Sequence, residues 1–194
     1  MSERCSVLLL TVGTGTRGMT VETILEPFRK SLEAAGAERN ILLPSRETEG
    51  IARNIQETFP QFRAEIRPLR AEGDENNADR CFEHYDAVIA ELLAAGVAPE
   101  QVIADITRGT KAMSAALLLA AAVRGVRRVR YLVGGQRNES GNAEPGTERV
   151  SDIEPSFIFV RQTLLRAEEL LRVGDFRAVE RLLMPLMPGK ARPR

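Results

Sequence analysis

The sequence holds few of the residues on which metal sites, disulfides and histidine-dependent enzymes rely. Its two cysteines, Cys5 and Cys81, lie far apart without a C-x-x-C spacing, and His84 is its single histidine. Two isolated cysteines indicate neither a disulfide framework nor a zinc knuckle, and a lone histidine argues against a His-based triad or a His-rich metal site. We therefore expect reduced thiols, a His84 that packs or lies on the surface, and no metal or other cofactor.

Long apolar runs and an excess of charge of either sign are also missing. No apolar run reaches the roughly 18 residues of a membrane span, and the run at 7–10 is too short for a signal peptide. Lys and Arg number 27, as do Asp and Glu, so the formal net charge is zero. A chain held to duplex nucleic acid by phosphate contacts is usually basic. We therefore expect a cytoplasmic protein with no membrane segment, no duplex partner and only a local anion site.

Apolar segments of strand length alternate with segments of helical periodicity over the first two thirds of the chain. The 194 residues are 43% hydrophobic, which is enough for one core and a short appendage. Repeated alternation of strand and helix is typical of a parallel sheet with helices on both faces. We predict an α/β, Rossmann-like, doubly wound fold with strands at 6–12, 40–43, 62–68, 102–106 and 128–133 and helices at 20–35, 47–59, 78–95 and 110–124.

The pattern changes after the fifth predicted strand. Two turn signals, NESGN and EPGTE, fall within 134–152 and predict a β-hairpin insertion. Beyond Pro155 the periodicity is helical only, with a Gly-Asp break near the middle. We therefore predict a Rossmann-like domain over 1–155 and a C-terminal helical hairpin over 156–194, with helices at 157–173 and 176–186.

A glycine-rich segment follows the first predicted strand. Residues 11–20, TVGTGTRGMT, fit the pattern G-x-G-x-x-G between a strand and a helix. Glycines there let the backbone approach a phosphate, and the helix N-terminus supplies N–H donors. The segment is not an ATP-binding P-loop, because Met19 stands where that loop needs a lysine. Its candidate ligand-binding residues are Thr11, Gly13, Thr14, Gly15, Thr16 and Arg17.

The same glycine pattern leaves a dinucleotide enzyme open. A dinucleotide site needs an acidic residue at the end of the second strand, and this chain has Pro44, Ser45 and Arg46 there. Because Ser45 and Arg46 could hold a 2′-phosphate, an NADP-dependent oxidoreductase is one alternative. A tight turn that binds no ligand is another.

A second loop, DITRGTKAM at 105–113, follows the fourth predicted strand. Thr107 or Thr110 can cap the next helix, and the turn at Gly109 can present N–H groups to an anion. Lys111 lies in the first helical turn, where a cation opposes the helix dipole and an anion would offset it. The carboxyl ends of parallel strands meet at one edge of a sheet, so we expect one metal-free crevice for phosphates and riboses. Its further candidates are Arg46, Asp105, Arg108, Met113, Gly134, Gly135 and Arg137.

The segment 105–113 resembles the D-x-T-x-G-T-K-x-M signature of CRISPR-associated Rossmann-fold (CARF) domains. Residues 131–150, YLVGGQRNESGNAEPGTERV, resemble the same family's segment after strand five, and TVGTG and Ser45 match in type and place. The resemblance covers about residues 5–155, with Arg108 where the family often has glycine. It implies a homodimer that binds cyclic tetra- or hexa-adenylate as a sensor in type III CRISPR antiviral signalling. The contacts that it implies are Thr11, Gly13, Thr14, Ser45, Thr107, Gly109, Thr110 and Lys111.

CARF sensors usually control an effector domain, often a ribonuclease. The R-x₄₋₆-H and E-x-K nuclease patterns are absent from this sequence, so the helical hairpin could link the sensor to an effector module that this chain lacks. Some family members instead cleave the ring without metal, by attack of a ribose 2′-OH that leaves a 2′,3′-cyclic phosphate. Whether this chain is such a ring nuclease stays open. Its catalytic residues would be Lys111 and Arg108, for charge, and Thr14 and Ser45, for orienting the ribose.

Overall fold

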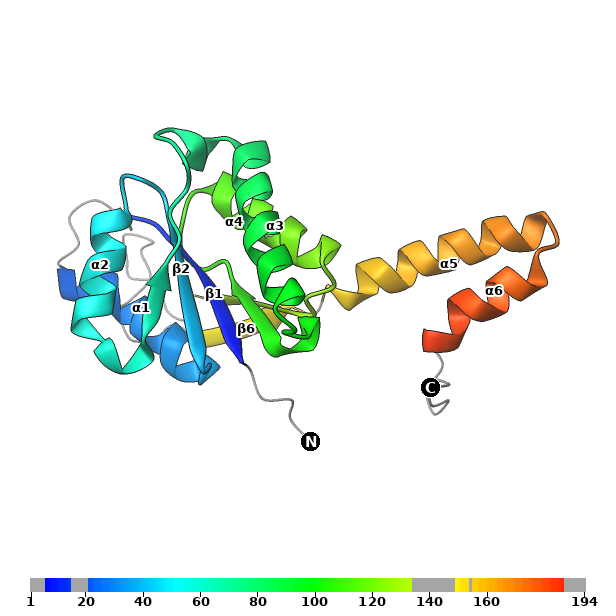
Figure 1. Cartoon of the computed structure of the whole chain (residues 1–194), viewed down its shortest axis with the longest axis horizontal. Helices are drawn as coiled ribbons and strands as arrows, with labels where there is room; N and C mark the ends of the chain where they lie inside the picture. Colours follow the sequence, from blue (N-terminus) through cyan, green and yellow to red (C-terminus); the bar gives the residue numbers. More distant parts are fainter. Residues whose placement is uncertain (1–5, 15–20, 134–148, 154, 187–194) are drawn as a thin grey trace, which may run out of the picture. The chain divides into compact units, whose positions relative to one another are not determined.

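The computed structural model describes residues 6–14, 21–133, 149–153 and 155–186. The chain divides into two compact units, Met1–Glu154 and Pro155–Arg194. The first unit contains a six-stranded sheet, and the described part of the second is helical (Figure 1). Both glycine-rich loops belong to the first unit.

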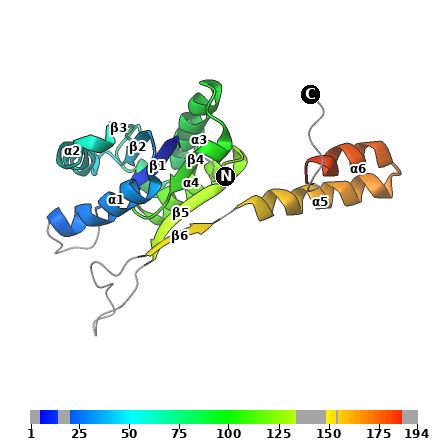
Figure 2. The same cartoon turned by 90° about the horizontal axis from the view of Figure 1, so that it is seen from below.

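Six strands form one sheet in the order β3-β2-β1-β4-β5-β6. Neighbouring strands are parallel, except that β6 is antiparallel to β5 (Figure 2). The direction in which strands are added reverses between β1 and β4, which is the hallmark of a doubly wound sheet. The predicted Rossmann-like fold is therefore confirmed. The bounds are β1 Val7–Val12, β2 Arg39–Pro44, β3 Ala64–Ile66, β4 Val102–Asp105, β5 Arg128–Val133 and β6 Arg149–Ile153.

Helices cover both faces of the sheet. Figure 1 shows α1 and α2 on one side of it and α3 and α4 on the other. Apolar side chains occupy both alternating sets of positions in β1, VLLLTV, so both faces of this central strand are buried. Val7 and Leu9 belong to the core under α3 and α4, and Leu8 and Leu10 to the core under α1 and α2. The bounds are α1 Val21–Ala35, α2 Glu49–Thr58, α3 Ala78–Ala94 and α4 Lys111–Val123.

Polar groups fix where α3 begins and how it lies beside α4. The Asn77 side chain accepts from the N–H groups of Asp79 and Arg80, each at 3.1 Å, and so caps α3. Arg124 donates to both carboxylate oxygens of Asp86 at 2.5 and 2.6 Å. This bidentate pair joins the residue after α4 to the middle of α3.

The third strand is shorter than predicted. β3 has three residues instead of seven, because a 3₁₀ turn, η1 Pro60–Phe62, occupies the start of the predicted segment. Arg63, which follows this turn, has a φ of +46° and so interrupts the extended backbone before β3. The β-hairpin insertion was predicted within 134–152, and 134–148 lie outside the described residues. The described end of that segment belongs to β6, which pairs antiparallel with β5.

The second unit is a pair of helices. α5 spans Ser156–Arg172, α6 spans Phe176–Leu183, and a 3₁₀ turn, η4, follows at Met184–Leu186. Gly174 has a φ of +79° in the connection, and the Asp175 side chain caps α6 through the Ala178 N–H. Ala167 and Val179 are buried. None of the described helices is both long enough and apolar enough to cross a membrane.

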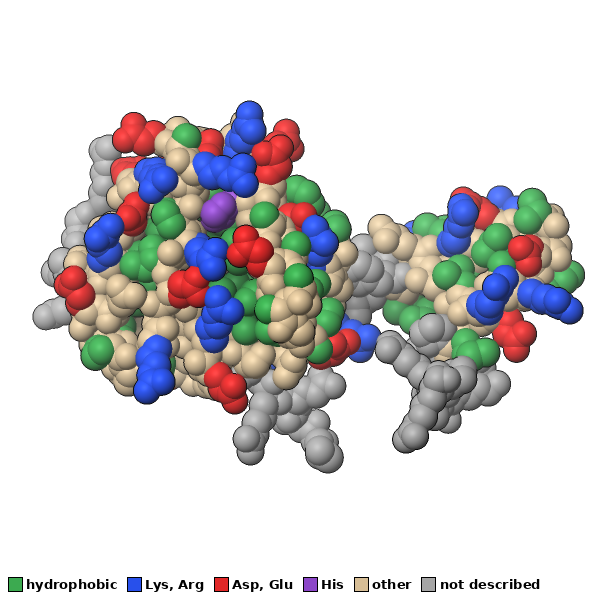
Figure 3. Space-filling model, in the orientation of Figure 1, with side chains coloured by type: hydrophobic (Ala, Val, Ile, Leu, Met, Phe, Trp, Pro, Cys, Tyr) green, Lys and Arg blue, Asp and Glu red, His purple; other side chains and the backbone are tan. Residues whose placement is uncertain are grey.

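The surface of the sheet unit carries charges of both signs. Figure 3 shows Lys and Arg side chains interspersed with Asp and Glu around His84. The His84 Nε2 lies 3.2 Å from the Arg67 carbonyl oxygen, and its ring packs edge-on against Tyr85. Burial lowers the pKa of His84, because a charged imidazolium loses its hydration there. Cys81 is a buried free thiol, and burial raises its pKa to about 11.

Candidate functional site

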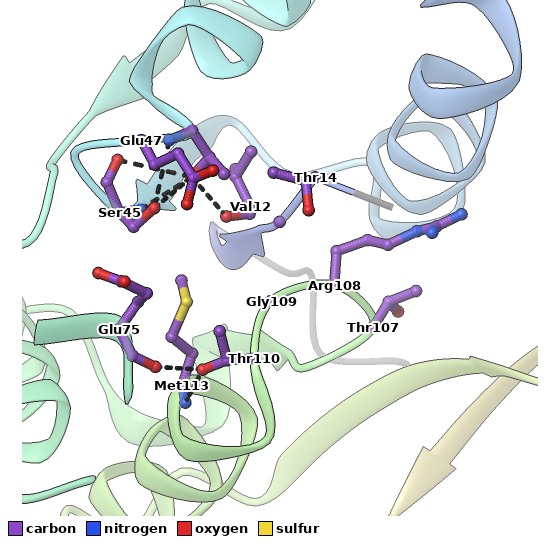
Figure 4. Close-up of a pocket in the computed structure, with 12 residues that line it drawn as sticks. Val12, Thr14, Ser45, Glu47, Glu75, Thr107, Arg108, Gly109, Thr110 and Met113 are labelled. Carbon is purple, nitrogen blue, oxygen red and sulfur yellow. Dashed lines mark hydrogen bonds between the residues drawn. The ribbon is translucent and has the colours of Figure 1, made fainter. Parts of the chain in front are cut away.

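A cavity of about 290 Å³ lies at the carboxyl ends of β1, β2 and β4 (Figure 4). These ends flank the point where the strand order reverses, which is the usual place for a ligand in an open α/β sheet. The walls come from the loops after β1, β2 and β4, the start of α4 and a 3₁₀ turn, η2 Asp74–Asn76. The lining residues are Val12, Gly13, Thr14, Ser45, Glu47, Thr48, Glu75, Thr107, Arg108, Gly109, Thr110 and Met113.

Gly13 and Gly109 bring the loops after β1 and β4 into backbone contact. A Cβ atom on Gly13 would lie 2.5 Å from the Gly109 nitrogen and 2.7 Å from its Cα. Gly109 has a φ of +122°, which L side chains rarely adopt, and a Cβ there would lie 3.2 Å from the Met113 Cβ. The two loops can therefore meet only because both positions are glycine. Sequence reasoning assigned these glycines to phosphate approach, and the structure adds this second reason.

The hydroxyls of Thr11 and Thr107 bond to the protein itself. Thr11, buried at the end of β1, donates to the Arg108 carbonyl oxygen. Thr107 donates to the Asp105 carboxylate and accepts from the Leu132 N–H at 3.0 Å. A hydroxyl has a single proton to donate. In this structure neither threonine can donate to a ligand, and both instead hold the loop after β4 in place.

The Thr110 hydroxyl also forms its hydrogen bonds within the protein. Its Oγ1 accepts from the Met113 N–H at 3.2 Å, so Thr110, and not Thr107, caps α4. The same hydroxyl donates to the Glu75 carbonyl oxygen. This bond from the cap residue of α4 holds η2 beside the cavity.

Ser45 and Thr48 form a closed pair of hydroxyls after β2. Thr48 Oγ1 donates to the Val12 carbonyl oxygen at 2.8 Å, so Ser45 is the donor in the 3.1 Å bond between the two hydroxyls. The Thr48 N–H returns to Ser45 Oγ at 3.2 Å. Both side chains are almost fully buried. Ser45 thus lines the cavity as predicted, but its proton goes to Thr48, and the pair fixes the entry to α2 against β1.

Asp105 lies beneath the cavity and does not line it. Its side chain is fully buried and accepts from the Ser31 hydroxyl of α1, from the Thr107 hydroxyl and from the Thr107 N–H at 2.8 Å. Burial raises the pKa of this carboxyl, and the hydrogen bonds from Ser31 and Thr107 oppose that rise. In this arrangement Asp105 positions the loop after β4 and has no surface to offer a ligand.

The predicted site residues divide into three groups. One group lines the cavity: Gly13, Thr14, Ser45, Thr107, Arg108, Gly109, Thr110 and Met113. A second group is described but does not line it: Thr11, Arg46, Asp105 and Lys111. Arg46 bonds to the Arg70 carbonyl oxygen and Glu49, and Lys111 is exposed at the start of α4. A third group lies outside the described residues: Gly15, Thr16, Arg17, Gly134, Gly135 and Arg137.

Sequence reasoning missed four lining residues. Val12 and Glu47 directly adjoin predicted site residues and Thr48 follows Glu47, so a wider window on the same loops would have included them. For Glu75 the available signal was its place in the loop after β3, whose carboxyl end lies at the same edge of the sheet. The charged lining residues that the structure describes are Glu47, Glu75 and Arg108, of which only Arg108 was predicted.

The two kinds of charge lie on different sides of the cavity. Figure 4 shows Glu47 and Glu75 on the side that carries Ser45 and Met113, and Thr14 and Arg108 on the opposite side. The Arg108 side chain extends away from the glutamates, toward the blue helix at the right. Among the described residues, no group of three or more His, Cys, Asp or Glu side chains is placed to hold a metal ion.

Comparison with solved structures relates this chain to two proteins. Csm6 of Enterococcus italicus, bound to cyclic hexa-2′-fluoro-hexa-dAMP, superposes with a TM-score of 0.65 and 16% identity over 95% of this chain and 50% of its own. Can2 of Sulfobacillus thermosulfidooxidans, in complex with cyclic tetra-adenylate, superposes with a TM-score of 0.50 and 16% identity over 73% of this chain and 37% of its own. This chain thus spans half or less of the length of either protein.

No family model and no curated protein matches the sequence. Csm6 and Can2 are both CARF-domain proteins of type III CRISPR systems. At 16% identity the likeness concerns the fold, and the order and direction of the strands agree with it. The chain therefore has the fold of the CARF domains, the family that its DITRGTKAM segment resembles.

Proposed function

We propose that this chain binds a cyclic oligoadenylate and acts in the cytoplasm as a sensor in type III CRISPR antiviral signalling. The observation that carries the proposal is the cavity at the reversal of strand order, which the DITRGTKAM loop lines. One protein of the same fold is bound to cyclic tetra-adenylate, and another is bound to a cyclic analogue with six nucleotides. A ligand of this kind offers phosphates, riboses and bases to one surface.

The start of α4 suits a phosphate of the ring. Thr110 caps the Met113 N–H, whereas helix geometry gives the N–H groups of Lys111 and Ala112 no acceptor within the helix. Free N–H groups and the positive end of the helix dipole favour an anion there. The phosphate would then be bound by backbone N–H groups rather than by the threonine hydroxyls that were predicted to contact it.

The ring requires two copies of the chain. A cavity of about 290 Å³ is at the small end of ligand sites, which span roughly 300–1,000 Å³, so one chain holds only part of a tetranucleotide or hexanucleotide. Residues four apart on α4 form an exposed stripe of Lys111, Ala115, Leu119 and Val123, with Leu119 55% and Val123 64% exposed. Two such stripes, meeting across a twofold axis, give a homodimer and bring a Lys111 from each copy to the ring.

Binding has more support in the described residues than cleavage. Ring cleavage needs groups that orient a ribose and stabilise charge on a phosphate. Ser45, predicted to orient the ribose, gives its proton to Thr48, and Lys111, predicted to stabilise charge, lies outside the cavity of its own chain. The ring nuclease therefore stands as the alternative that the experiment must separate from a sensor.

The helical unit has exposed apolar side chains that a link to an effector would use. Leu164, Leu165, Val173 and Phe176 are between 47% and 77% exposed. We propose a ligand-sensing domain over 1–155 and a helical hairpin over 156–194 that packs against an effector module. The Csm6 chain, twice as long as the matched region, has room for such a module.

The test is thermal melting with cyclic tetra-adenylate, cyclic hexa-adenylate or NADPH in EDTA, followed by chromatography of the nucleotide. A ring at a hundredfold excess over its Kd raises the melting temperature by about 5–10 °C, and recovery of intact ring identifies a sensor. Linear products that end in a 2′,3′-cyclic phosphate would identify a ring nuclease. A shift with NADPH alone would overturn the proposal in favour of the oxidoreductase.

Light scattering tests the dimer with the same ligands. The chain should have twice the monomer mass, and Leu119→Glu should halve that mass and weaken ring binding. Leu165→Glu, a matched change on the helical unit, should leave both unchanged. A monomeric wild-type chain that binds the ring fully would contradict the twofold site.

A further inference from the structure

Two glutamates line a cavity that the proposed function assigns to an anionic ligand. Glu47 and Glu75 both contribute to its wall. Neither forms an ion pair within the described chain, whereas Glu49 bonds to Arg46 and Arg53 and Glu65 bonds to Arg39. Water can hydrate these carboxylates while the cavity is open, but a ligand that displaces this water must replace it with hydrogen-bond donors of its own.

Glu75 is held in place from two directions. Its carbonyl oxygen accepts from the Thr110 hydroxyl, and its carboxylate accepts from the Asn76 side-chain amide at 3.0 Å. The side chain is partly buried, while that of Glu47 is exposed. Glu75 is therefore the better fixed of the two acceptors, and it has lone pairs left for a ligand because a carboxylate accepts about four hydrogen bonds.

The chemistry of a carboxylate decides which part of a nucleotide can meet it. An ionised carboxylate only accepts hydrogen bonds, and phosphate oxygens only accept them too, so a phosphate beside Glu75 would be repelled. An exocyclic amine on a base donates. The same side of the cavity is lined by the Met113 side chain (Figure 4). Met113 is 1% exposed and belongs to the core, so it offers a ligand only the edge of its side chain, whose thioether packs well against an aromatic ring. An acceptor beside this apolar edge matches an amino-purine.

We propose that Glu75, assisted by Glu47, accepts a hydrogen bond from the exocyclic N6 amine of adenine and so selects adenine-containing rings. The inference rests on the proposed function, because it places a base of the cyclic oligoadenylate in this cavity. It assigns the base to the side of the cavity with Glu75 and Met113, and the phosphate keeps its proposed place at the N–H groups of Lys111 and Ala112 at the start of α4. Glu75 thus determines specificity for the ligand and takes part in no chemical step.

The test compares two rings on three variants. One ring is the cyclic oligoadenylate that the wild-type chain binds, and the other contains purine riboside, which lacks only the exocyclic amine. The variants are Glu75→Ala, Glu75→Gln and the control Glu72→Ala, which alters an exposed glutamate of the same loop outside the cavity. Isothermal titration measures Kd for each pair, after circular dichroism has shown that the variant is folded.

The wild-type chain and Glu72→Ala should bind the adenine ring on the order of a hundredfold more tightly than the purine ring, about tenfold for each of the two hydrogen bonds to Glu75 that the dimer makes. Glu75→Ala should reduce this ratio to near one. Equal affinity of the wild-type chain for the two rings would overturn the inference and leave the proposed function standing. So would tighter binding of both rings by Glu75→Gln, because the carboxylate would then face a phosphate. If neither ring binds the wild-type chain, the proposed function fails and the inference fails with it.

Discussion

The sheet unit has two hollows that differ in how their charges are compensated. A groove of about 220 Å³ beside β3 and α3 is lined by Arg39, Arg67 and Glu91 and by apolar side chains. Arg39 bonds to Glu65 at 2.7 Å, and Arg67 bonds to Glu65 and to Glu91, at 3.2 Å from the latter. Every charge of the groove is therefore neutralised by a neighbour in the same chain.

The cavity at the carboxyl ends of the strands has the opposite character. Its glutamates have no ion pair within the described chain, while the lining hydroxyls of Ser45, Thr48, Thr107 and Thr110 already donate their protons to the protein. The two hollows are similar in volume, so size does not separate a ligand site from a surface groove. The two hollows differ instead in charge compensation, and under the proposed function the donors of the ligand would replace the water that hydrates the two glutamates of the cavity.

The largest effect should come from separating the two loops of the cavity. In Gly13→Ala the added Cβ meets the Gly109 backbone at 2.5 Å, and neither loop can yield without losing its bonds to Thr11 and Thr48. We expect a loss of about 2–4 kcal/mol in unfolding free energy and no measurable ring binding. Urea unfolding and titration with the ring measure the two effects.

Gly50→Ala provides the matched control for that change. Gly50 lies in α2, and a Cβ there would have no neighbour within 4 Å. Alanine in a helix stabilises by about 0.5–1 kcal/mol relative to glycine, so this variant should be slightly more stable and bind the ring as the wild type does. Equal effects of the two substitutions would mean that the contact between Gly13 and Gly109 does not hold the site together.

A substitution at Asp105 removes hydrogen bonds beneath the cavity without changing any residue that lines it. Asp105→Ala removes the acceptor for the Ser31 hydroxyl and for both groups of Thr107. Buried donors without acceptors should lower the unfolding free energy by about 3 kcal/mol and weaken ring binding through the displaced Thr107. Asp105→Asn keeps an acceptor for Thr107 and should cost much less than alanine.

The difference in unfolding free energy between Asp105→Asn and the wild type should change with pH in one direction. Burial raises the pKa of Asp105 in the folded state, so the folded chain holds this proton at pH values where the unfolded chain has released it. Stability from the neutral carboxyl is complete below the unfolded pKa, about 3.9, and is lost as pH rises through the folded value. Asp105→Asn should therefore gain on the wild type as pH rises from 3 to 8 in urea unfolding. If Asp105→Asn instead lost stability relative to the wild type over that range, the result would contradict the burial of an ionisable carboxyl at this position.

The apolar pattern predicted the fold well because the strands near the centre of the sheet can be recognised from their own residues. The runs VLLLTV and RVRYLV have the predicted lengths within one residue. All of VLLLTV is buried, which requires apolar side chains at nearly every position, whereas RVRYLV is buried only in part. β3 could not be predicted in this way. It is a three-residue edge strand, and its limits depend on the turn at η1 and on pairing with β2.

The site shows the same division between local and tertiary causes. Gly13 and Gly109 were identifiable because a strand, a glycine and a helix start are neighbours in the sequence. The destination of a hydroxyl proton depends on the folded chain: Thr110 has the predicted residue type and place, yet its proton goes to Glu75. Ser45 donates to nearby Thr48 because the Thr48 proton goes to the distant Val12 carbonyl oxygen. Which residues of the long loop after β3 reach the cavity also depends on this tertiary packing.

The smallest effect should come from the groove, where removing one charge leaves the others compensated. Burial alone raises the pKa of Glu65, but the hydrogen bonds from Arg39 and Arg67 outweigh it and leave the pKa below its ordinary value. The stability that this carboxylate contributes is present above the unfolded pKa and is lost as pH falls through the folded value. Because these side chains are partly exposed, Glu65→Gln should cost only about 0.5–1 kcal/mol at neutral pH.

That cost should shrink further in 1 M salt, which screens partly exposed charges, and it should fall steadily as the pH drops below the ordinary pKa of a glutamate. Ring binding should be unchanged, because the groove has no charge left for a ligand to satisfy. The same titration that measures Glu75→Ala serves as the readout. If Glu65→Gln weakened ring binding as much as Glu75→Ala, compensation of charge would not distinguish the two hollows, and the groove would have to be part of the ligand site.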